Sequence, residues 1–255
     1  MALRGILFDM GGTLLDYHPP TADPTLAWQA MEDMGAEALH EFLGERGYAL
    51  PALPDARAAS FAVMLAHWQS IGRGPEVNPQ LGPLLVEVMQ AWGIDGDAND
   101  LAEEAMAAYV SPVQAVVRAM PGARATLAAV QAAGLRTGLV SNTVWPGAFH
   151  LADLAQHGLL PYLEVAFFSA DVAAWKPHAR IFELALAALD LAPEEAVYVG
   201  DHPFFDVYGA QQVGMRGVWQ RSAEWADLEA FEQPIMPDAV IDRLPDLLTV
   251  IAQWR

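Results

Sequence analysis

Three aspartates and one lysine carry the charges with which this chain could bind a phosphate group and attack it. Asp9, Asp201 and Asp206 supply carboxylates, and Lys176 is the only lysine among 13 basic residues. Three negative charges against one positive charge leave a deficit of two, which one divalent cation would cancel. A ligand set made only of oxygen favours Mg²⁺, which proteins bind through one or two carboxylates, waters and substrate phosphates. These residue types therefore predict a magnesium site that faces an anionic group.

Further groups that could bind a phosphate lie in the segments around these four residues. The Ser141 hydroxyl, the Lys176 ammonium and backbone N–H groups near Gly12 could neutralise the equatorial oxygens of a transferring phosphoryl group. Asn142, beside Ser141, completes the predicted phosphate-binding set. An aspartate at a strand end, such as Asp9, can attack phosphorus and form an aspartyl-phosphate. The chemistry indicated is phosphoryl transfer.

These residues follow the ends of predicted strands. The expected strands are apolar runs that end in polar, turn-forming residues, at 3–8, 135–141, 164–168 and 196–200, with further strands at 216–220 and 239–241. The expected helices between and after them lie at 121–133, 146–157, 178–190, 204–213 and 244–253. Strands that alternate with helices of this length form βαβ units and a parallel sheet. Ligands of such sheets bind beyond the carboxyl ends of the strands, where the polar residues would converge.

The stretch between the first strand and the rest of the sheet has a different pattern. It is punctuated by Pro and Gly, has almost no β-branched runs, and predicts helices at 25–43, 55–70, 80–92 and 99–110. We therefore expect an α/β core of residues 1–16 and 119–255 and an inserted all-helical cap of residues 17–118. The predicted fold class is a doubly wound, Rossmann-like parallel sheet with this cap.

Four short motifs in this order resemble those of the haloacid dehalogenase-like hydrolase superfamily. The first is ILFDMGGTLLD at 6–16, and the second is LVSN at 139–142. The third is Lys176-Pro177, and the fourth is GDHPFFD at 200–206. Each stands at or beyond a predicted strand end, and the helical insertion stands where that superfamily places its cap. The resemblance covers the whole predicted core.

The resemblance implies a role for each matching residue. It assigns the nucleophile to Asp9. It assigns Mg²⁺ binding to Asp9, Asp201, Asp206 and the backbone carbonyl of Gly11, and phosphate binding to Ser141 and Lys176. The implied activity is a Mg²⁺-dependent phosphatase of small organic phosphates, with small phosphate esters as partners.

Gly11 departs from the family pattern. Phosphatases of this superfamily carry an aspartate two residues after the nucleophile, which protonates the leaving alcohol, and glycine cannot donate a proton. In one account another group replaces it (Asp16, His18, His67 or His202), or substrates with good leaving groups, such as acyl phosphates, need less help. In a second account, the chain belongs to a branch of the superfamily that does not use an aspartate at this position. In a third account, the site binds Mg²⁺ or phosphate but turns substrate over poorly, and the protein has a binding or regulatory role.

The second account divides into two branches of the superfamily. The phosphonatase-like branch needs a cap lysine, and residues 20–118 contain none. The dehalogenase-like branch uses no metal and an aromatic residue at position 11, which matches neither Gly11 nor the pair Asp201 and Asp206. The phosphatase is the preferred interpretation, with a dehalogenase and a non-catalytic phosphate-binding protein as alternatives.

Composition narrows the classes of partner. The net charge is −19 and there is no cysteine, which argues against nucleic acid, an anionic membrane surface and thiolate metal sites. No run approaches the ~20 apolar residues of a transmembrane helix, and the first residues do not read as a secretion signal. We expect a cytoplasmic monomer or homodimer.

Overall fold

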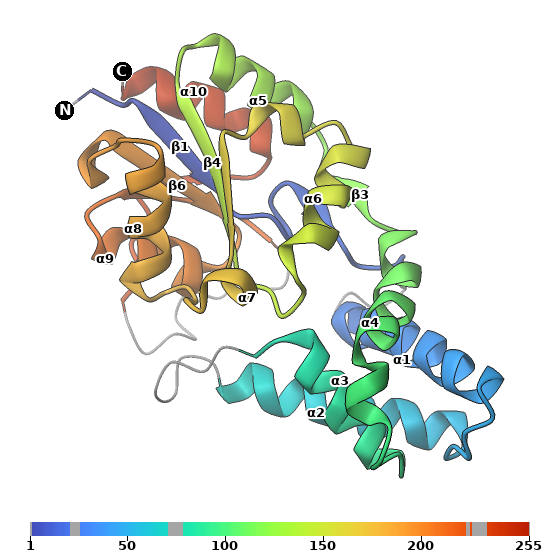
Figure 1. The fold of residues 1–255 in the computed structure, drawn as a ribbon. Helices are drawn as coiled ribbons and strands as arrows, with labels where there is room; N and C mark the ends of the chain where they lie inside the picture. Colours follow the sequence, from blue (N-terminus) through green and yellow to red (C-terminus); the bar gives the residue numbers. More distant parts are fainter. Residues whose placement is uncertain (1, 21–25, 71–78, 223–224, 226–233, 255) are drawn as a thin grey trace. The chain divides into compact units, whose positions relative to one another are not determined.

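A parallel sheet of six strands organises one part of the molecule (Figure 1). The structure is a computed structural model that describes residues 2–20, 26–70, 79–222, 225 and 234–254, and every count of strands or helices refers to those residues. The strands are β1 (Gly5–Phe8), β4 (Arg136–Ser141), β5 (Val165–Phe168), β6 (Ala196–Gly200), β7 (Arg216–Gln220) and β8 (Ala239–Ile241). Their order is β5-β4-β1-β6-β7-β8, and every neighbouring pair is parallel. The predicted doubly wound α/β fold is thereby confirmed.

The central strands are apolar because both faces of the sheet are covered. All residues of β1 and β6 are buried, as expected for a parallel sheet between helical layers. Figure 1 shows α5 (Ala123–Ala132) and α10 (Leu247–Gln253) on one face, with α8 (Ala179–Ala188) and α9 (Gly209–Gln212) on the other. The sheet order places β1 between β4 and β6, so the segments that follow these three strands leave the sheet side by side.

Two predicted helices begin differently from the expectation. The helix expected at 204–213 starts as a wide π-helical turn, η4 (Pro203–Tyr208), and only then continues as α9. The helix expected at 244–253 starts with a 3₁₀ turn at Leu244–Asp246. π-Helical turns frequently occur at functional sites, and η4 carries Asp206.

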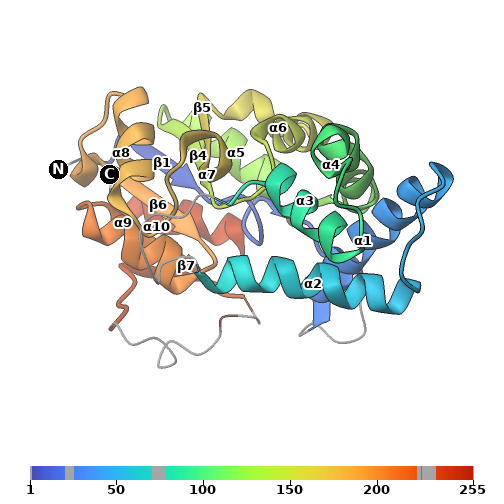
Figure 2. The ribbon, with the colours of Figure 1, turned by 60° about the horizontal axis from the view of Figure 1, so that its bottom comes forward.

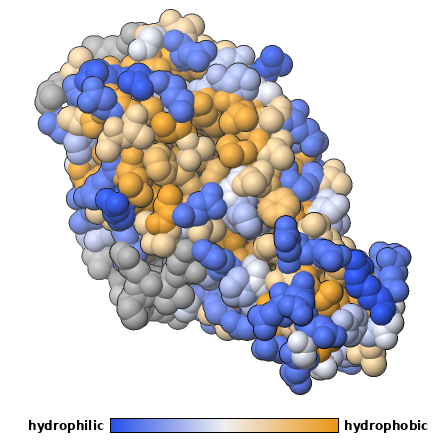
Figure 3. Space-filling view, in the orientation of Figure 1, coloured by the Kyte–Doolittle hydropathy of each residue, from blue (hydrophilic) through white to orange (hydrophobic). Residues whose placement is uncertain are grey.

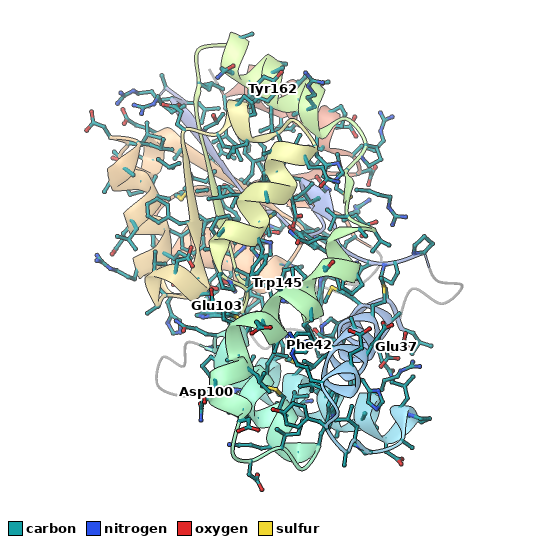
Figure 4. All side chains as sticks on the ribbon, turned by 45° about the vertical axis from the view of Figure 1, so that its right-hand side comes forward. Glu37, Phe42, Asp100, Glu103, Trp145 and Tyr162 are labelled. Carbon is teal, nitrogen blue, oxygen red and sulfur yellow. The ribbon has the colours of Figure 1, made fainter. Side chains whose placement is uncertain are left out.

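The four helices described in the stretch between β2 (Leu15–Asp16) and β3 (Arg118–Ala119) pack on one another as a bundle. They are α1 (Ala27–Glu45), α2 (Leu53–Ser70), α3 (Leu81–Ala91) and α4 (Ala98–Gln114). α1 contacts α2 and α4, and α3 contacts the same two helices (Figure 2). Leu39, Leu85 and Tyr109 are buried between them. On the outside of α1, Glu37, labelled in Figure 4, pairs with Arg57 at 3.0 Å.

The chain divides into two compact units. One comprises Met1–Asp16, Arg118–Thr143 and His150–Arg255, and the other comprises Tyr17–Val117 together with Val144–Phe149. The short segment Val144–Phe149 differs from the expected boundaries, which placed it in the core. It belongs with the helices because its backbone and side chains are bound there.

Three contacts hold that segment within the helical unit. The Leu81 N–H donates to the Val144 carbonyl at 2.7 Å. The Gln114 Nε2 donates to the Phe149 carbonyl at 3.2 Å. Trp145, labelled in Figure 4, packs edge-on against Tyr17 with ring centroids 6.0 Å apart. The loop after β4 therefore makes an excursion into the second unit and returns as α6 (Gly147–Gln156).

The chain leaves the α/β unit for the helical unit and returns twice. At each of these two places, hydrogen bonds join the departing segment to the returning one. At the first place, the two segments form the antiparallel ladder of β2 and β3, which an ion pair between Arg118 and Asp16 at 2.8 Å supports. At the second place, Thr143 Oγ1 and His150 Nε2 lie 2.7 Å apart. Both sets of contacts lie within the α/β unit.

The visible surface mixes hydrophobic and hydrophilic residues (Figure 3). Large exposed hydrophobic side chains among the described residues are Leu26, Leu53, Leu151, Met236 and Val240, and single exposed residues of this kind are ordinary in folded proteins. None of the described helices combines the length and the apolar character that a membrane span requires.

Candidate active site

The structure brings the three predicted aspartates together. Asp9 directly follows β1, Asp201 directly follows β6, and Asp206 lies in η4. One carboxylate oxygen from each lies within 4.8 Å of the other two. Asp9 and Asp206 are buried. The parallel register of β1 with β6, in which Phe8 pairs with Val199, places Asp9 beside the start of the Asp201 loop.

Lys176 is bound directly to this cluster. Its Nζ donates to Asp9 Oδ1 at 2.6 Å, to Asp206 Oδ1 at 2.6 Å and to the Tyr198 hydroxyl at 2.9 Å. Lys176 is buried, so water does not screen these contacts as it would at a surface. The only lysine of the chain thus lies between two of the three carboxylates.

Electrostatics at this cluster favour an added cation. Burial raises the pKa of Asp9 to about 6, although the Lys176 ammonium acts in the opposite direction. Burial disfavours the charged form of Lys176, but Asp206 and Asp9 outweigh it and raise the lysine pKa above its usual value. Three carboxylates against one ammonium leave two uncompensated charges. The cluster has the charge and the all-oxygen ligands that suit a hard dication such as Mg²⁺.

Glycines allow two of these carboxylates to lie against the backbone. A Cβ built on Gly12 would come 2.5 Å from Asp201 Oδ2, and one built on Gly200 would come 2.2 Å from Asp206 Oδ2. Gly12 has φ +74°, a left-handed conformation that glycine adopts without strain. Only glycine satisfies both the space and the conformation at position 12.

Gly11 is a different case from Gly12. It lies in a tight turn in which the Leu14 and Leu15 N–H groups donate to the Met10 carbonyl at 2.8 and 2.9 Å. Its φ is not in the left-handed range, and a Cβ built there has no described atom within 4 Å beyond its chain neighbours. Position 11 therefore has room for a side chain that this sequence lacks.

The second motif uses its asparagine to hold the lysine segment. Ser141 is the buried last residue of β4. The Asn142 Nδ2 donates to the Lys176 carbonyl at 3.0 Å, and the Lys176 N–H donates to Asn142 Oδ1 at 2.8 Å. This paired contact is a different use of Asn142 from the phosphate contact predicted for it, because the carboxamide fixes the backbone that carries the ammonium.

Thr143 is anchored on three sides. The Thr143 backbone N–H donates to Ser169 Oγ at 2.8 Å, and the Ser169 hydroxyl in turn donates to the Thr143 carbonyl at 2.9 Å. The Thr143 hydroxyl meets His150 Nε2, and that ring stacks on Phe168 at 5.3 Å. Burial lowers the pKa of His150 to about 3, so the ring is neutral. The segment after Ser141 is therefore fixed from α6 and α7 (Ser169–Val172).

His202 acts as a helix cap. Its Nδ1 accepts the Phe204 and Phe205 N–H groups at 3.2 Å each, and its own N–H donates to Asp206 Oδ2 at 2.9 Å. Burial lowers its pKa to about 4. A neutral ring whose Nδ1 is occupied is a poor proton donor, so the structure gives His202 a structural use.

Three residues of the site were not identified from the sequence. Tyr198 of β6 binds Lys176, the Trp219 Nε1 donates to the Asp201 carbonyl at 2.9 Å, and the Gln220 Nε2 donates to the Gly12 carbonyl at 3.0 Å. All three lie in strands whose apolar pattern predicts only core packing. The one available signal was the place of Trp219 and Gln220 at the carboxyl end of β7.

The chain belongs to the haloacid dehalogenase-like hydrolase family, whose family model matches residues 3–214. The resemblance carried by the four sequence motifs is thereby confirmed.

The proteins to which the chain is similar include two phosphatases and, among solved structures, a 2-haloacid dehalogenase. The chain is 35% identical over 150 residues to a glyceraldehyde 3-phosphate phosphatase of Pyrococcus furiosus. This match covers 56% of this chain and 59% of that protein. The chain is 30% identical over 217 residues to a phosphoglycolate phosphatase of Yersinia pseudotuberculosis, over 84% of this chain and 78% of that protein. A crystal structure of a 2-haloacid dehalogenase from Pseudomonas syringae superposes with a TM-score of 0.70 at 25% identity, over 99% of this chain and all of that one.

Proposed function

We propose that this protein is a Mg²⁺-dependent phosphatase of small organic phosphates that acts through Asp9. One observation carries the proposal: a buried Asp9 carboxylate held by Lys176 within a cluster of three carboxylates. The relatives named as phosphatases of glyceraldehyde 3-phosphate and phosphoglycolate support it. Both names denote small phosphorylated molecules, which is the substrate class that we assign.

The metal would be held by Asp9, Asp201, the Gly11 carbonyl and Asp206. Mg²⁺ would neutralise the phosphate oxygens and the cluster's excess negative charge. Asp206 already accepts from Lys176 on Oδ1 and from the His202 N–H on Oδ2, so it would use its remaining lone pairs or bind through water. The Gln220 contact with the Gly12 carbonyl fixes the turn that carries the Gly11 carbonyl.

The reaction has two displacements at phosphorus. An Asp9 oxygen attacks, the bond from phosphorus to the leaving oxygen breaks, and that oxygen departs with its electron pair. Water then attacks the same phosphorus, the bond to Asp9 breaks, and inorganic phosphate and the free carboxylate result. The proton released by the water balances the one taken up by the leaving group. Ser141 and Lys176 would bind the phosphate oxygens throughout.

The missing acid at position 11 restricts the substrates. Asp16 pairs with Arg118 at 2.8 Å, and His202 is a neutral cap. His67, in the helical unit, pairs with Glu87 at 3.0 Å. The structure thus engages both candidates of the α/β unit, Asp16 and His202, in other contacts, and we propose that the leaving oxygen departs with little help from a protein acid. This favours phosphates with good leaving groups, such as acyl or aryl phosphates.

Hydrolysis of p-nitrophenyl phosphate with Mg²⁺ and with chelator tests the proposal. We expect turnover that needs Mg²⁺ and that Asp9→Asn lowers by at least about 10³-fold, because the neutral amide that replaces the carboxylate has no anionic oxygen to attack phosphorus. Asp242→Asn, which alters an exposed carboxylate, is the control and should keep full activity. Full activity in Asp9→Asn would show that Asp9 is not the nucleophile.

The structural likeness to a 2-haloacid dehalogenase favours a second candidate function, metal-independent cleavage of carbon–halogen bonds. Chloride release from 2-chloropropionate in the presence of chelator would support it. A third outcome, tight phosphate binding with no turnover on either substrate, would identify a phosphate-binding protein.

A further inference from the structure

The Lys176 ammonium has no N–H left for a substrate. A lysine side chain has three donors and no acceptor. Each donor is used: on Asp9 at 2.6 Å, on Asp206 at 2.6 Å and on the Tyr198 hydroxyl at 2.9 Å. A phosphate can therefore receive a hydrogen bond from Lys176 only if one of these acceptors gives it up.

Tyr198 is the weakest of the three acceptors. All three contacts have a charged donor, but only the two carboxylates carry an opposite charge, and Coulomb attraction to the ammonium strengthens these two contacts in the buried site. The Tyr198 hydroxyl is neutral, and its contact with Lys176 is the longest of the three. Its single hydrogen is donated to the Val140 carbonyl at 2.6 Å, so Lys176 must be the donor in their contact.

Tyr198 is also too firmly held to follow the ammonium. Its side chain is fully buried, and its ring packs edge-on against Phe182 with centroids 5.1 Å apart. The bond to Val140, the residue before Ser141, fixes the hydroxyl at the end of β4. When the ammonium turns toward a phosphate, the hydroxyl keeps its bond to Val140 and gives up the one from Lys176.

We propose that Tyr198 is a positioning residue that holds the third N–H of Lys176 before substrate binds and yields it to the substrate phosphate. The proposal rests on the proposed function, since it requires a phosphate beside Lys176. It implies that the hydroxyl and the phosphate compete for one donor. Tyr198 therefore weakens phosphate binding while it keeps the substrate-free site intact.

Tyr198→Phe tests this competition because it removes the hydroxyl and keeps the ring. The substrate-free variant has a buried charged N–H without an acceptor, which is unfavourable until a phosphate supplies one. We expect calorimetric titration with inorganic phosphate at saturating Mg²⁺ to give a dissociation constant about tenfold lower than that of the wild type. Without phosphate the variant should unfold at a lower temperature.

Tyr48→Phe is the matched control. It also removes a tyrosine hydroxyl, one that donates to a carboxylate, Asp97 at 2.9 Å, within the helical unit. It should leave the phosphate dissociation constant unchanged. Equal or weaker phosphate binding by Tyr198→Phe would overturn the inference while the proposed function stands. Binding by neither the wild type nor the variant would refute the phosphate site itself.

A second measurement needs no variant. Because Lys176 is the only lysine, ¹⁵N-lysine labelling gives a single ammonium signal in the NMR spectrum. Phosphate should shift that signal as one N–H changes its acceptor. A signal that stays in place while calorimetry shows phosphate binding would overturn the inference.

Discussion

Gly12 and Asp201 are so close that a methyl group cannot fit between them: a Cβ on Gly12 would lie 2.5 Å from Asp201 Oδ2. Neighbouring residues of β7 hold both partners, since Gln220 binds the Gly12 carbonyl and Trp219 binds the Asp201 carbonyl. The turn after β1 and the carboxylate after β6 are therefore placed by one strand. Any change at Gly12 must displace a proposed metal ligand.

Gly12→Ala should lose both stability and metal response. The left-handed backbone should cost about 1–2 kcal/mol of the free energy of unfolding. The displaced Asp201 should raise the Mg²⁺ concentration needed for half-maximal activity. Urea denaturation and a Mg²⁺ titration of aryl phosphate hydrolysis measure the two effects.

Gly47→Ala separates the two causes. Gly47 has φ +84° and no atom within 4 Å of a built Cβ, so alanine there introduces strain without a contact. It should lose a similar free energy of unfolding and keep the wild-type Mg²⁺ response. An unchanged Mg²⁺ response in Gly12→Ala would remove Asp201 from the proposed ligand set.

Gly11→Asp should widen the range of substrates. The open space around Gly11 admits a side chain, and a carboxylic acid there could protonate the leaving oxygen. General acid catalysis contributes about 10²–10⁴-fold in rate. We expect a gain of that order on an alkyl phosphate such as glycerol phosphate and little gain on p-nitrophenyl phosphate, whose leaving group needs no proton.

The dependence of kcat/KM on the leaving-group pKa across a series of phosphate esters checks this prediction. The slope should be steep in the wild type and shallow in Gly11→Asp. Gly11→Asn, which is similar in size but a far weaker acid, is the control and should keep the steep slope. An equally shallow slope in the wild type would mean that another acid already serves the site.

Glu32 in the helical bundle should make the protein less stable as pH rises. Burial raises its pKa to about 6, although Tyr109 and Trp28 both donate to its carboxylate. The folded state therefore holds the proton more tightly than the unfolded state, whose pKa is 4.5. The resulting stability is present below pH 4.5 and is lost as pH rises through 6, a change of about 2 kcal/mol.

Glu32→Gln copies the protonated form and cannot titrate. It should be more stable than the wild type at pH 7.5, with the difference vanishing near pH 4.5, when urea midpoints are compared across this range. Glu45→Gln, which alters an exposed residue of the same helix, should follow the wild type throughout. A constant difference between wild type and Glu32→Gln at all pH values would contradict the prediction.

His150 should act in the opposite sense. Its pKa falls from 6.5 to about 3 on burial, so the unfolded chain takes up a proton that the folded chain refuses. Its contribution is present above pH 6.5 and is lost as pH falls toward 3, by about 3 kcal/mol at pH 4. His150→Asn should be less stable than the wild type at pH 7.5, yet lose less stability on acidification. Parallel curves of unfolding free energy against pH would rule this out.

The sequence was sufficient to predict which strand ends carry the polar residues of the candidate site. Apolar runs that end in Asp9, Ser141 and Asp201 indicate strands, and the carboxyl ends of parallel strands meet at one edge of the sheet. The convergence of the aspartates with Lys176 follows from that geometry. What each polar group contacts does not follow, because hydrogen bonds depend on side-chain directions.

Particular residues show the limit. Tyr198 lies within the apolar run of β6, and nothing in its neighbours indicates that its hydroxyl reaches Lys176. His202 stands beside Asp201 and is a candidate proton donor by proximity, yet its ring turns back to cap η4. The excursion of Val144–Phe149 had no signal either, since its partners Leu81 and Gln114 are distant in sequence.

That excursion has a practical consequence for dissecting the molecule. Excising residues 17–117 would remove Tyr17, on which Trp145 packs, and the helices whose Leu81 and Gln114 bind the segment around it. In the shortened chain, Trp145 would lie in the loop after Ser141 without its Tyr17 packing partner. A working minimal enzyme would need a redesigned loop between Thr143 and His150, short and polar, as well as a new join between β2 and β3.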